Sequence, residues 1–599
     1  MAEKIKEERG AWSSRWGFIM AAAGSAVGLG NIWKFPYITG ENGGGLFVLI
    51  YLCCIALVGL PIMVAEIMIG RAAQKQPVGA FARIQGGRTA WSAVGWLGIV
   101  SGFVILSYYV VVAGWAMDYT LKSVVNFTKD IHDEAAVEAT TARATTPLET
   151  MRRELAERRA EHDSRSEIED LRRRAPAFVW KDFERFQTAR ARAAEAGGDP
   201  AAMEAEKRLL ADEKLAGSVK VARELTRRMD AAREAGLKQA RQWVSSLPEA
   251  ELLARYEDQV RRDGIRDRVA RTFVDMASDG WTATFWALLF MLLAILIVSM
   301  GISSGIERWC KILMPVLIVL ITVMVIYGTT RTGFSAALSF VFKPDASKLK
   351  ASGVLEALGH AFFTLSLGMG AMITYGSYQK SKDGLIGQSI AIAGMDTLIA
   401  LLACMMMFPI VFSYGQEPAA GPGLVFMSMP LAFSEIGTGG MLLAIIFFGL
   451  LVFAALTSAI SLLEVVASYF IDQRGWSRHR AAWTLGGAIF LFGLPSAFAM
   501  APDPVFSSWE STFGKNFFDT MDYLASNWLL AMGGLLIAVY AGWVMPKRII
   551  DAEFEGAGRA FILAWSALIR WVAPVLVIVV LAQKVGLLDA DAIFYSLGL

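Results

Sequence analysis

Long apolar segments separated by short charged ones dominate the hydropathy pattern of this chain. A helix needs about 20 consecutive apolar residues to cross a bilayer, and many of these segments reach that length. They predict about eleven transmembrane helices, at residues 16–38, 44–69, 92–122, 282–300, 310–328, 356–378, 385–412, 440–471, 481–499, 522–545 and 560–583. The pattern therefore predicts an all-α integral membrane protein.

Basic residues mark one side of these segments. Lysines and arginines precede the first segment, follow the second and recur in alternate later loops, for example at Arg9, Arg71, Lys311, Lys382 and Arg478. Such loops are cytoplasmic under the positive-inside rule. We expect a membrane protein with its N-terminus in the cytoplasm and, because the number of spans is odd, its C-terminus outside.

One long polar region interrupts the apolar pattern. Residues 128–278 are rich in Ala, Arg and Glu, with sparse leucines at helical spacing, which predicts an extracytoplasmic helical insertion. The chain would then divide into residues 1–127 with three spans, the insertion, and residues 279–599 with the remaining spans. The insertion could dock an unknown protein partner or gate the membrane part, or it could be a solvated addition with neither role.

Composition supports a membrane protein. The chain is 55% hydrophobic and its mean hydropathy is +0.45, both high for a soluble protein. A net charge of +2 gives no reason to expect a nucleic-acid partner. The four cysteines lie in or beside apolar segments, so an extracytoplasmic disulfide framework is excluded.

The first apolar segment contains a break. Residues 24–36 carry three glycines and then Asn31 and Pro36, although each freed N–H or C=O costs several kcal/mol in lipid unless it finds a new partner. The alternative is close helix packing through Gly24 and Gly28, which leaves Asn31 unexplained. We expect a discontinuous helix whose opened backbone binds a solute and cations near the middle of the membrane.

Three later features are of the same kind. Residues 363–370 predict a second broken helix in the sixth span, as two inverted five-helix repeats would require. Residues 454–458 place two hydroxyls inside the eighth span, where such groups often bond only to their own helix. Asp396 lies inside the seventh apolar run, where an ionisable group indicates a functional site.

No nucleophile–base pair, metal-ligand spacing or phosphate loop suggests an enzyme.

Taken together, these stretches resemble a bacterial member of the neurotransmitter:sodium symporter family, which would lie in the bacterial inner (plasma) membrane. The resemblance covers the chain except residues 128–278 and rests on residues 24–36, 41–45, 108–109, 363–370, 373–378 and 454–458. It implies a fold of two inverted five-helix repeats with broken first and sixth helices, and sodium-coupled transport.

The resemblance also implies two sodium sites made of oxygen donors, which suit a hard cation. The first would use Ala26, Asn31, Thr364 and Asp396 with the substrate carboxylate. The second would use Gly24, Val27, Ala454, Thr457 and Ser458.

For the substrate, the resemblance implies a zwitterion. Its carboxylate would meet the N–H groups of Leu29 and Gly30 and the Tyr109 hydroxyl. Its amino group would meet carbonyls of Ala26, Phe363 and Thr364, near Ser366. Monoamine carriers of the family have an aspartate where this chain has Gly28, which favours amino acids here. The side-chain pocket would consist of Ile105, Phe363, Ser366, Met369, Ser458 and Leu462, which suits a neutral, hydrophobic side chain without naming one.

Gates are implied in the same way. Lys34 and Asp522 resemble an outer ion pair, above a lid of Tyr109 and Phe363. Arg9 and Asp472, with Trp12 and Tyr378, resemble a cytoplasmic latch. For the charged residues, the competing interpretation is interfacial snorkelling.

Chloride dependence is expected to be absent. Animal members bind chloride at positions that match Tyr51, His360, Thr364 and a polar group of the seventh span, and here Asp396 could supply the negative charge itself. Asp396 could also take up a proton when empty, with His360 coupled to it, although a lone intramembrane histidine often has only a structural role.

These expectations combine into a sodium-coupled symporter that imports a neutral amino acid by alternating access. The alternative is an amino-acid sensor that keeps the transporter fold and uses the insertion as its output domain. A uniport or channel-like pathway is disfavoured by the paired gates.

Overall fold

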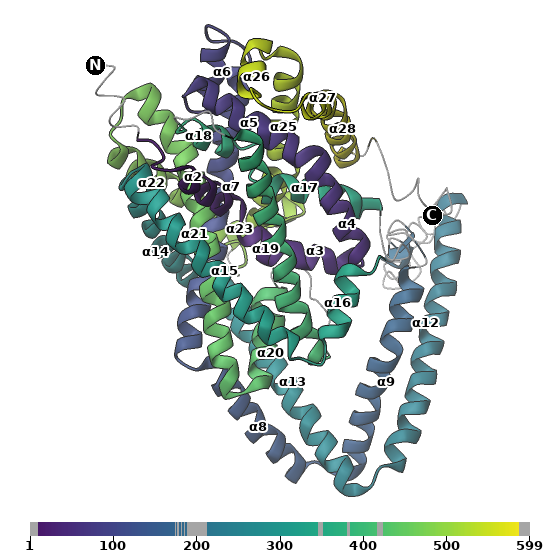
Figure 1. Ribbon diagram of the computed structural model, residues 1–599. Coiled ribbons are helices and arrows are strands. Elements are labelled where there is room, and N and C mark those ends of the chain that lie inside the picture. Colours follow the sequence, from purple (N-terminus) through teal and green to yellow (C-terminus); the bar gives the residue numbers. More distant parts are fainter. Residues whose placement is uncertain are drawn as a thin grey trace. The chain divides into compact units, whose positions relative to one another are not determined.

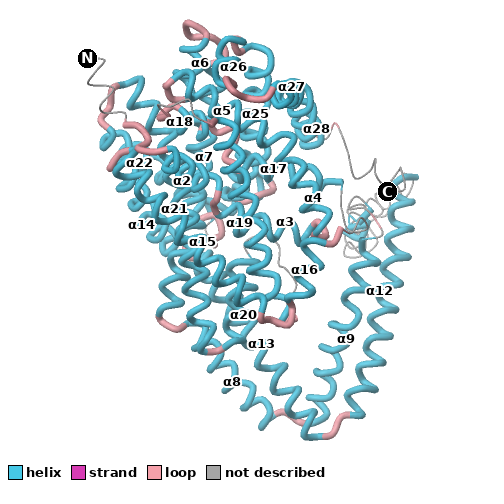
Figure 2. The backbone as a smooth tube through the Cα atoms, viewed as in Figure 1, coloured by secondary structure: helices cyan, strands magenta, loops and turns pink. Residues whose placement is uncertain are grey.

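The computed structural model consists of helices, with no strand among the residues that it describes (Figures 1 and 2). These are residues 10–173, 175, 179–180, 183–184, 186–188, 213–344, 351–379, 384–415, 423–502, 504–585 and 587. The all-α architecture predicted from the apolar pattern is confirmed.

Eight helical segments in the described part of the chain are long and apolar enough to cross a membrane. They are Gly45–Ala73 (α4, η2 and α5), Ser92–Val124 (α7), Gly280–Ser299 (α14), Ile302–Thr329 (η3 and α15), Leu385–Ser413 (α19), Gly439–Arg474 (within α21, Thr438–Arg474), Phe517–Val544 (α24, η6, α25 and η7) and Arg559–Gln583 (α27, η8 and most of α28). Each coincides with one of the predicted spans.

Three further predicted spans are shorter or less apolar. The first span is broken into α2 (Arg15–Ala26), η1 (Gly30–Lys34) and α3 (Phe35–Glu41). The sixth is broken into α17 (Ala351–Thr364) and α18 (Ala371–Gly376). The ninth is α22 (Arg478–Ala497), whose first turn carries basic side chains. Both predicted helix breaks are therefore present, one at the start of each five-helix half.

Short helices connect the spans. They are α6 (Pro77–Ile84), α16 (Phe334–Phe342), η5 (Leu424–Ser428) with α20 (Met429–Ile436), α23 (Pro504–Phe513) and α26 (Lys547–Glu553). On the spans themselves, large apolar side chains such as Leu296, Val319 and Leu491 are exposed. Exposed apolar side chains on long apolar helices are expected for a surface that contacts lipid.

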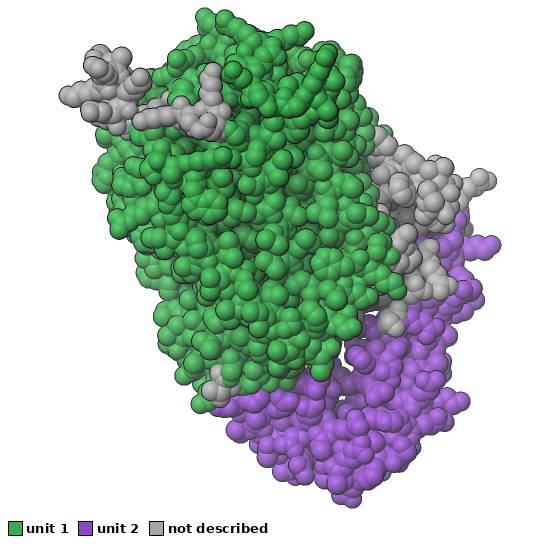
Figure 3. Space-filling view, viewed as in Figure 1, with its two compact units in different colours: residues 1–131, 266–588 green, residues 132–265, 589–599 purple. Residues whose placement is uncertain are grey.

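The structure divides into two compact units (Figure 3). The first contains the spans, in residues 1–131 and 266–588, and the second is built around His132–Ile265. This part of the second unit lies within the predicted insertion, 128–278, and is four residues shorter at its start and thirteen shorter at its end. Two helices run from one unit into the other without interruption, α8 (Phe127–Thr145) and α13 (Glu249–Ser278).

The insertion has a core of its own. Its two longest helices besides α13 are α9 (Leu148–Arg173) and α12 (Glu213–Ser246), which lie side by side (Figure 1). Leu155, Ala156 and Ala160 of α9 pack against Ala240 and Val244 of α12. Trp243 lies between two guanidinium groups, with Arg159 at 4.6 Å and Arg255 at 5.0 Å from the ring centre. Because small alanines form much of this core, the two helices can pack closely.

Candidate functional site

The first helix break opens the backbone in the middle of the bundle. α2 ends at Ala26, and Val27 adopts an extended conformation (φ −74°, ψ 97°). Asn31, at the start of the second half-helix, reaches back into the break, because its side-chain oxygen accepts a hydrogen bond from the Gly28 N–H at 3.0 Å. Asn31 thereby satisfies a backbone group that the break leaves outside the helix, which explains its place after the glycines.

The second break contains three residues with positive φ. These are Ser366 (φ 53°), Gly368 (φ 79°) and Gly370 (φ 74°). Glycine adopts this conformation freely, whereas serine does so at a cost. Ser366 gains a compensating contact, since its hydroxyl donates to the Ser25 carbonyl in the first break at 2.8 Å. The two breaks are therefore joined directly.

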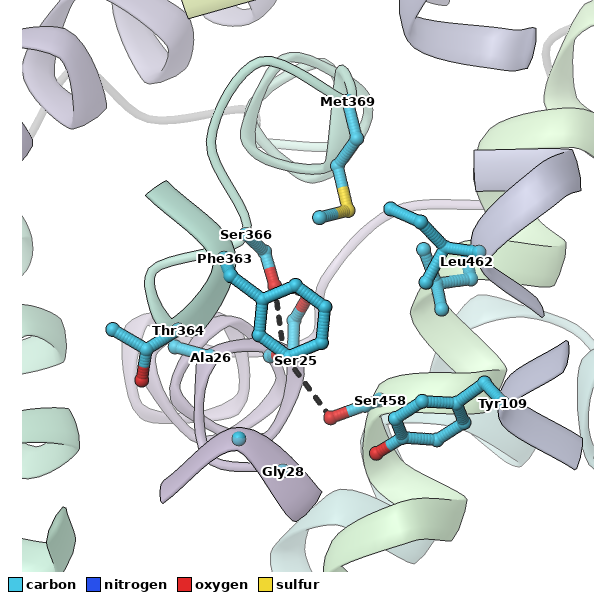
Figure 4. Close-up of a pocket in the computed structure, with 12 residues that line it drawn as sticks. Ser25, Ala26, Gly28, Tyr109, Phe363, Thr364, Ser366, Met369, Ser458 and Leu462 are labelled. Atoms are coloured by element: carbon cyan, nitrogen blue, oxygen red, sulfur yellow. Dashed lines mark hydrogen bonds between the residues drawn. The ribbon is translucent and has the colours of Figure 1, made fainter. Parts of the chain in front are cut away.

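A pocket lies between the two breaks and the helices α7 and α21 (Figure 4). Ten of the eleven predicted substrate-binding residues line it: Ala26, Gly30, Ile105, Tyr109, Phe363, Thr364, Ser366, Met369, Ser458 and Leu462. Leu29 does not line the pocket, but its N–H donates to the Tyr109 hydroxyl at 3.2 Å. The residues expected to receive a carboxylate are thus adjacent.

The pocket also contains Ser25, which the sequence analysis did not single out, and Gly28, the position where monoamine carriers have an aspartate. Ser25 is part of a hydroxyl cluster: it donates to Ser461 at 2.7 Å, and the Ser458 hydroxyl donates to the Ser25 carbonyl at 3.2 Å (Figure 4). A side chain at position 28 would collide with the Ser458 hydroxyl. Ser25 sits inside the motif at residues 24–36, so its polarity in an apolar run was a usable signal.

Two of the residues predicted for the first sodium site, Asn31 and Thr364, bond to Asp396, and a third, Ala26, lines the adjoining pocket with Thr364. The Asp396 carboxylate accepts hydrogen bonds from the Asn31 amide at 2.6 Å, the Thr364 hydroxyl at 2.8 Å and the Tyr51 hydroxyl at 3.3 Å. Asp396 is fully buried. A buried carboxylate needs compensation from a cation or from several donors. The Asp396 carboxylate and the Thr364 hydroxyl are oxygen donors that fit a hard cation, whereas the Asn31 oxygen is turned toward the Gly28 N–H and its amide NH2 faces Asp396.

The residues predicted for the second sodium site also lie together. The Thr457 hydroxyl is 3.5 Å from the Val27 carbonyl and 2.9 Å from the Ala454 carbonyl. The Ser458 hydroxyl is 3.4 Å from the Gly24 carbonyl. This donor set consists of neutral carbonyls and hydroxyls, a combination that suits a monovalent hard cation. The roles of both sets as ion sites remain predictions.

The predicted outer gate forms an ion pair. Lys34 Nζ is 3.6 Å from Asp522 and 4.9 Å from the centre of the Phe363 ring. Asp522 also accepts hydrogen bonds from the hydroxyls of Tyr108 and Ser526, each at 3.0 Å. The charged pair thus lies directly beside the aromatic residue that lines the pocket.

At the opposite end of the bundle, Trp12 packs against the sixth span. Its indole N–H donates to the Tyr375 carbonyl at 2.8 Å, and its ring centre is 6.1 Å from that of Tyr378. Asp472 accepts a hydrogen bond from the Gln76 N–H at 3.1 Å. Arg9, the predicted partner of Asp472, lies outside the described residues.

Sequence reasoning missed several buried carboxylates, among them Glu66, Glu307 and Glu464. Glu66 accepts the Gly368 N–H at 2.7 Å and so supports the second break. Glu307 accepts the Ser13 N–H at 2.7 Å, and Glu464 pairs with Arg478 at 2.6 Å. Each lies in or beside an apolar run, so the rule that flags Asp396 would also have flagged these residues.

His360 lies beside the first predicted sodium set. Its ring stacks against Phe35 and also approaches Tyr51, with both centroid distances 5.6 Å. It is 2% exposed, and neither ring nitrogen has a hydrogen-bond partner among the described residues. The structure thus brings together the three positions expected to match a chloride site, Tyr51, His360 and Thr364, around Asp396.

The fold and this pocket define a class of protein, a multi-pass membrane transporter and not an enzyme. A family model described as the sodium:neurotransmitter symporter family matches residues 9–165 and 271–594. The chain belongs to that family. The residues between the two matched ranges, 166–270, fall within the predicted insertion.

Individual relatives agree with this assignment. The chain is 29% identical to the uncharacterized sodium-dependent transporter YhdH of Bacillus subtilis, over 96% of this chain and 98% of the relative. It is 24% identical to the sodium-dependent nutrient amino acid transporter 1 of Drosophila melanogaster, over 82% of this chain and 66% of the relative. The crystal structure of MhsT in complex with L-phenylalanine is similar, with a TM-score of 0.67 and 34% identity, over 96% of this chain and 99% of MhsT.

Proposed function

We propose that this sodium-dependent transporter imports a neutral, mostly hydrophobic amino acid together with two sodium ions. The observation that carries the proposal is the pocket itself, in which freed backbone, a tyrosine hydroxyl and apolar side chains meet beside two sets of oxygen donors. The named ligand of MhsT, L-phenylalanine, is an amino acid of this kind.

Backbone groups would fix the two charged ends of the substrate. The N–H of Leu29, now bonded to the Tyr109 hydroxyl, begins the second half of a broken helix, whose N-terminal end favours a carboxylate. The amino group would bind free carbonyls at the end of α2 and in the second break. Since position 28 is a glycine and carries no acidic side chain, an amine that lacks its own carboxylate would find no counter-ion there.

The side-chain end of the substrate would meet apolar residues. Ile105, Met369 and Leu462 line the pocket opposite the hydroxyl cluster around Ser25. A charged side chain in that position would lose its hydration without gaining a partner. Substrates that differ by one methylene would differ by only ~1–3 kcal/mol, so several hydrophobic amino acids should compete.

The ions would provide both order and driving force. Sodium at the first set would neutralise Asp396 and contact the substrate carboxylate, and sodium at the second would join the first break to α21. Each inward charge gains about 2.3 kcal/mol per 100 mV before its concentration gradient is added. Because Asp396 already supplies a fixed negative charge, we propose that transport does not require chloride.

Alternating access would open the two ends in turn. The Lys34–Asp522 pair closes one end beside Phe363, and Trp12 closes the other against Tyr375 and Tyr378. We assign the Trp12 end to the cytoplasm from the distribution of basic residues. The first, second, sixth and seventh spans would rock against the others.

The proposal is tested in liposomes that contain the purified protein. Uptake of a labelled mixture of neutral amino acids is measured with an inward sodium gradient and with potassium in place of sodium. Sodium-driven accumulation is expected, and competition by unlabelled amino acids then identifies the substrate. Sodium-dependent binding without accumulation would instead favour the amino-acid sensor. Neither uptake nor binding would show that the substrate class is wrong.

A further inference from the structure

A continuous set of aromatic contacts starts on the helix that returns from the insertion. Phe273 lies near the end of α13, in the unit that contains the spans. Its ring stacks on Phe426 of η5, with ring centres 5.7 Å apart and planes 8° apart. The same ring meets the edge of Trp115 of α7 at 5.8 Å. Phe273 thus contacts two elements that are distant from it in sequence.

Trp115 connects Phe273 to a helix that carries a residue of the predicted outer gate. It is 2% exposed and stacks on Phe518 at 6.0 Å with an interplanar angle of 26°. Phe518 is the second residue of α24 (Phe517–Leu524), and its ring lies edge-to-face with that of Tyr108, with ring centres 5.5 Å apart. Aromatic pairs at these separations have a preferred relative orientation in addition to their hydrophobic contact. The positions of Phe518 and Tyr108 are therefore sensitive to Trp115.

Both of those residues lie close to Asp522, Phe518 on the same helix and Tyr108 through a hydrogen bond. Phe518 lies one turn before Asp522 on α24, so the two side chains share a face of that helix. The Tyr108 hydroxyl donates to the Asp522 carboxylate at 3.0 Å. Asp522 in turn pairs with Lys34 at 3.6 Å. A displaced ring at Phe518 would therefore shift the carboxylate and its hydrogen-bond donor together.

We propose that Phe273 is a positioning residue for the outer gate, acting on the Lys34–Asp522 pair through Trp115, Phe518 and Tyr108. Its own helix is continuous with the insertion, because α13 begins at Glu249. The gate role of that ion pair rests on the proposed function, whereas the aromatic contacts do not. Phe273 touches neither the pocket nor the ion pair, so its effect is on closure and not on binding chemistry.

The first test measures gate opening without any substrate. A cysteine is introduced at Ile105, which lines the pocket, and its labelling by a thiol reagent is followed in purified protein with sodium present. We expect Phe273→Leu to accelerate labelling about two- to tenfold, the change that corresponds to loss of one aromatic contact. Phe273→Tyr keeps the ring and should restore the slow rate. The protein without the Ile105 cysteine supplies the background from the four native thiols.

Matched variants separate positioning from general stability. Phe285 lies on the next helix and is 58% exposed, so Phe285→Leu makes the same change where no gate contact exists and should leave labelling unchanged. Asp522→Asn should accelerate labelling by itself, and Phe273→Leu should add little to it if both act on one gate. Equal labelling of the Phe273→Leu and Phe285→Leu proteins would overturn the proposal. So would additive effects of Phe273→Leu and Asp522→Asn.

A transport measurement then distinguishes this proposal from the proposed function. If unaltered protein accumulates an amino acid, Phe273→Leu should raise KM with little change in the maximal rate or in thermal stability. A lower thermal stability with unchanged KM would mean that Phe273 is only a packing residue. If unaltered protein accumulates nothing, the proposed function fails, and the labelling experiment still decides the role of Phe273.

Discussion

At the scale of single residues, the site depends on a few polar groups held inside an apolar bundle. Asp396 is the clearest case, since three donors from three different spans converge on one fully buried carboxylate. Gly28 is the opposite case, a position where the absence of a side chain leaves room for two hydroxyls. Both make specific predictions about transport.

Removal of the negative charge at Asp396 should change the ion requirement. In unaltered protein, replacing chloride by gluconate should leave sodium-driven uptake unchanged. Asp396→Asn should raise the sodium concentration needed for half-maximal uptake about tenfold or more, since hydrogen bonds and contacts to a charged group contribute about 1.5–3 kcal/mol to binding. Added chloride should restore part of this loss. Asp551→Asn, at an exposed position of α26, is the matched control. Collapse of wild-type uptake without chloride would contradict the assignment.

A methyl group at position 28 should weaken binding. Gly28→Ala would place its Cβ against the Ser458 hydroxyl and 3.0 Å from that of Tyr109. Overpacking of this kind costs about 1–3 kcal/mol, which corresponds to a rise of about fivefold or more in KM. Gly449→Ala is the control, because a Cβ there meets nothing within 4 Å. Unchanged amino-acid and sodium affinities in Gly28→Ala would show that the pocket lies elsewhere.

At the scale of elements, the broken helices are the functional parts. Each break depends on a contact from another span: Asp396 holds Asn31, which bonds to the first break, and Ser25 and Glu66 bond to the second. Unpaired backbone in a membrane interior is costly, so these contacts are a condition for the breaks to exist. A change within a break should therefore affect transport more than the same change at an ordinary helix end.

A pair of glycine substitutions tests this difference. Gly368 (φ 79°) lies in the second break, and Gly475 (φ 64°) ends α21 with nothing within 4 Å of an added Cβ. Alanine at either position bears a left-handed backbone, which costs roughly 1–2 kcal/mol. At Gly368 the Cβ would also collide with the Leu530 carbonyl. We expect Gly475→Ala to lower only thermal stability and Gly368→Ala to abolish uptake as well. Equal uptake by the two variants would show that the second break tolerates rearrangement.

At the scale of the whole molecule, the insertion is an addition with its own packing. Its helices bury separate small clusters, centred for example on Leu155 and Val244. None of its described residues lines the pocket or takes part in the gate contacts of the first unit. The membrane unit should therefore transport without it, provided that the end of α13 with Phe273 is kept.

Two deletions test this arrangement. Replacement of residues 132–265 by a flexible linker should leave the KM and maximal rate of uptake close to those of the full chain. Extension of the same deletion to residue 275 removes Phe273 and should raise KM. Loss of uptake in the shorter deletion, in protein that remains folded and membrane-inserted, would show that the insertion takes part in transport.

The sequence by itself determined the architecture of this protein. Membrane spans need long apolar runs, and a break in such a run needs glycines and polar residues, so residues 24–36 and 363–370 revealed both broken helices locally. Asp396 was detectable because a carboxylate inside a span is costly. The positions of most pocket residues followed from the family resemblance and not from local pattern.

Only the tertiary structure decided which distant groups meet. Ser25 bonds to Ser461, Glu66 to Gly368, and Phe273 contacts Trp115 and Phe426, across separations of 150 to more than 400 positions. The hydrophobic pattern along one helix shows which of its faces is buried but not which helix packs against that face, because helix packing depends on the shapes of both surfaces. The hydroxyl cluster, the support of the second break and the contacts that lead to the outer gate are consequences of that packing.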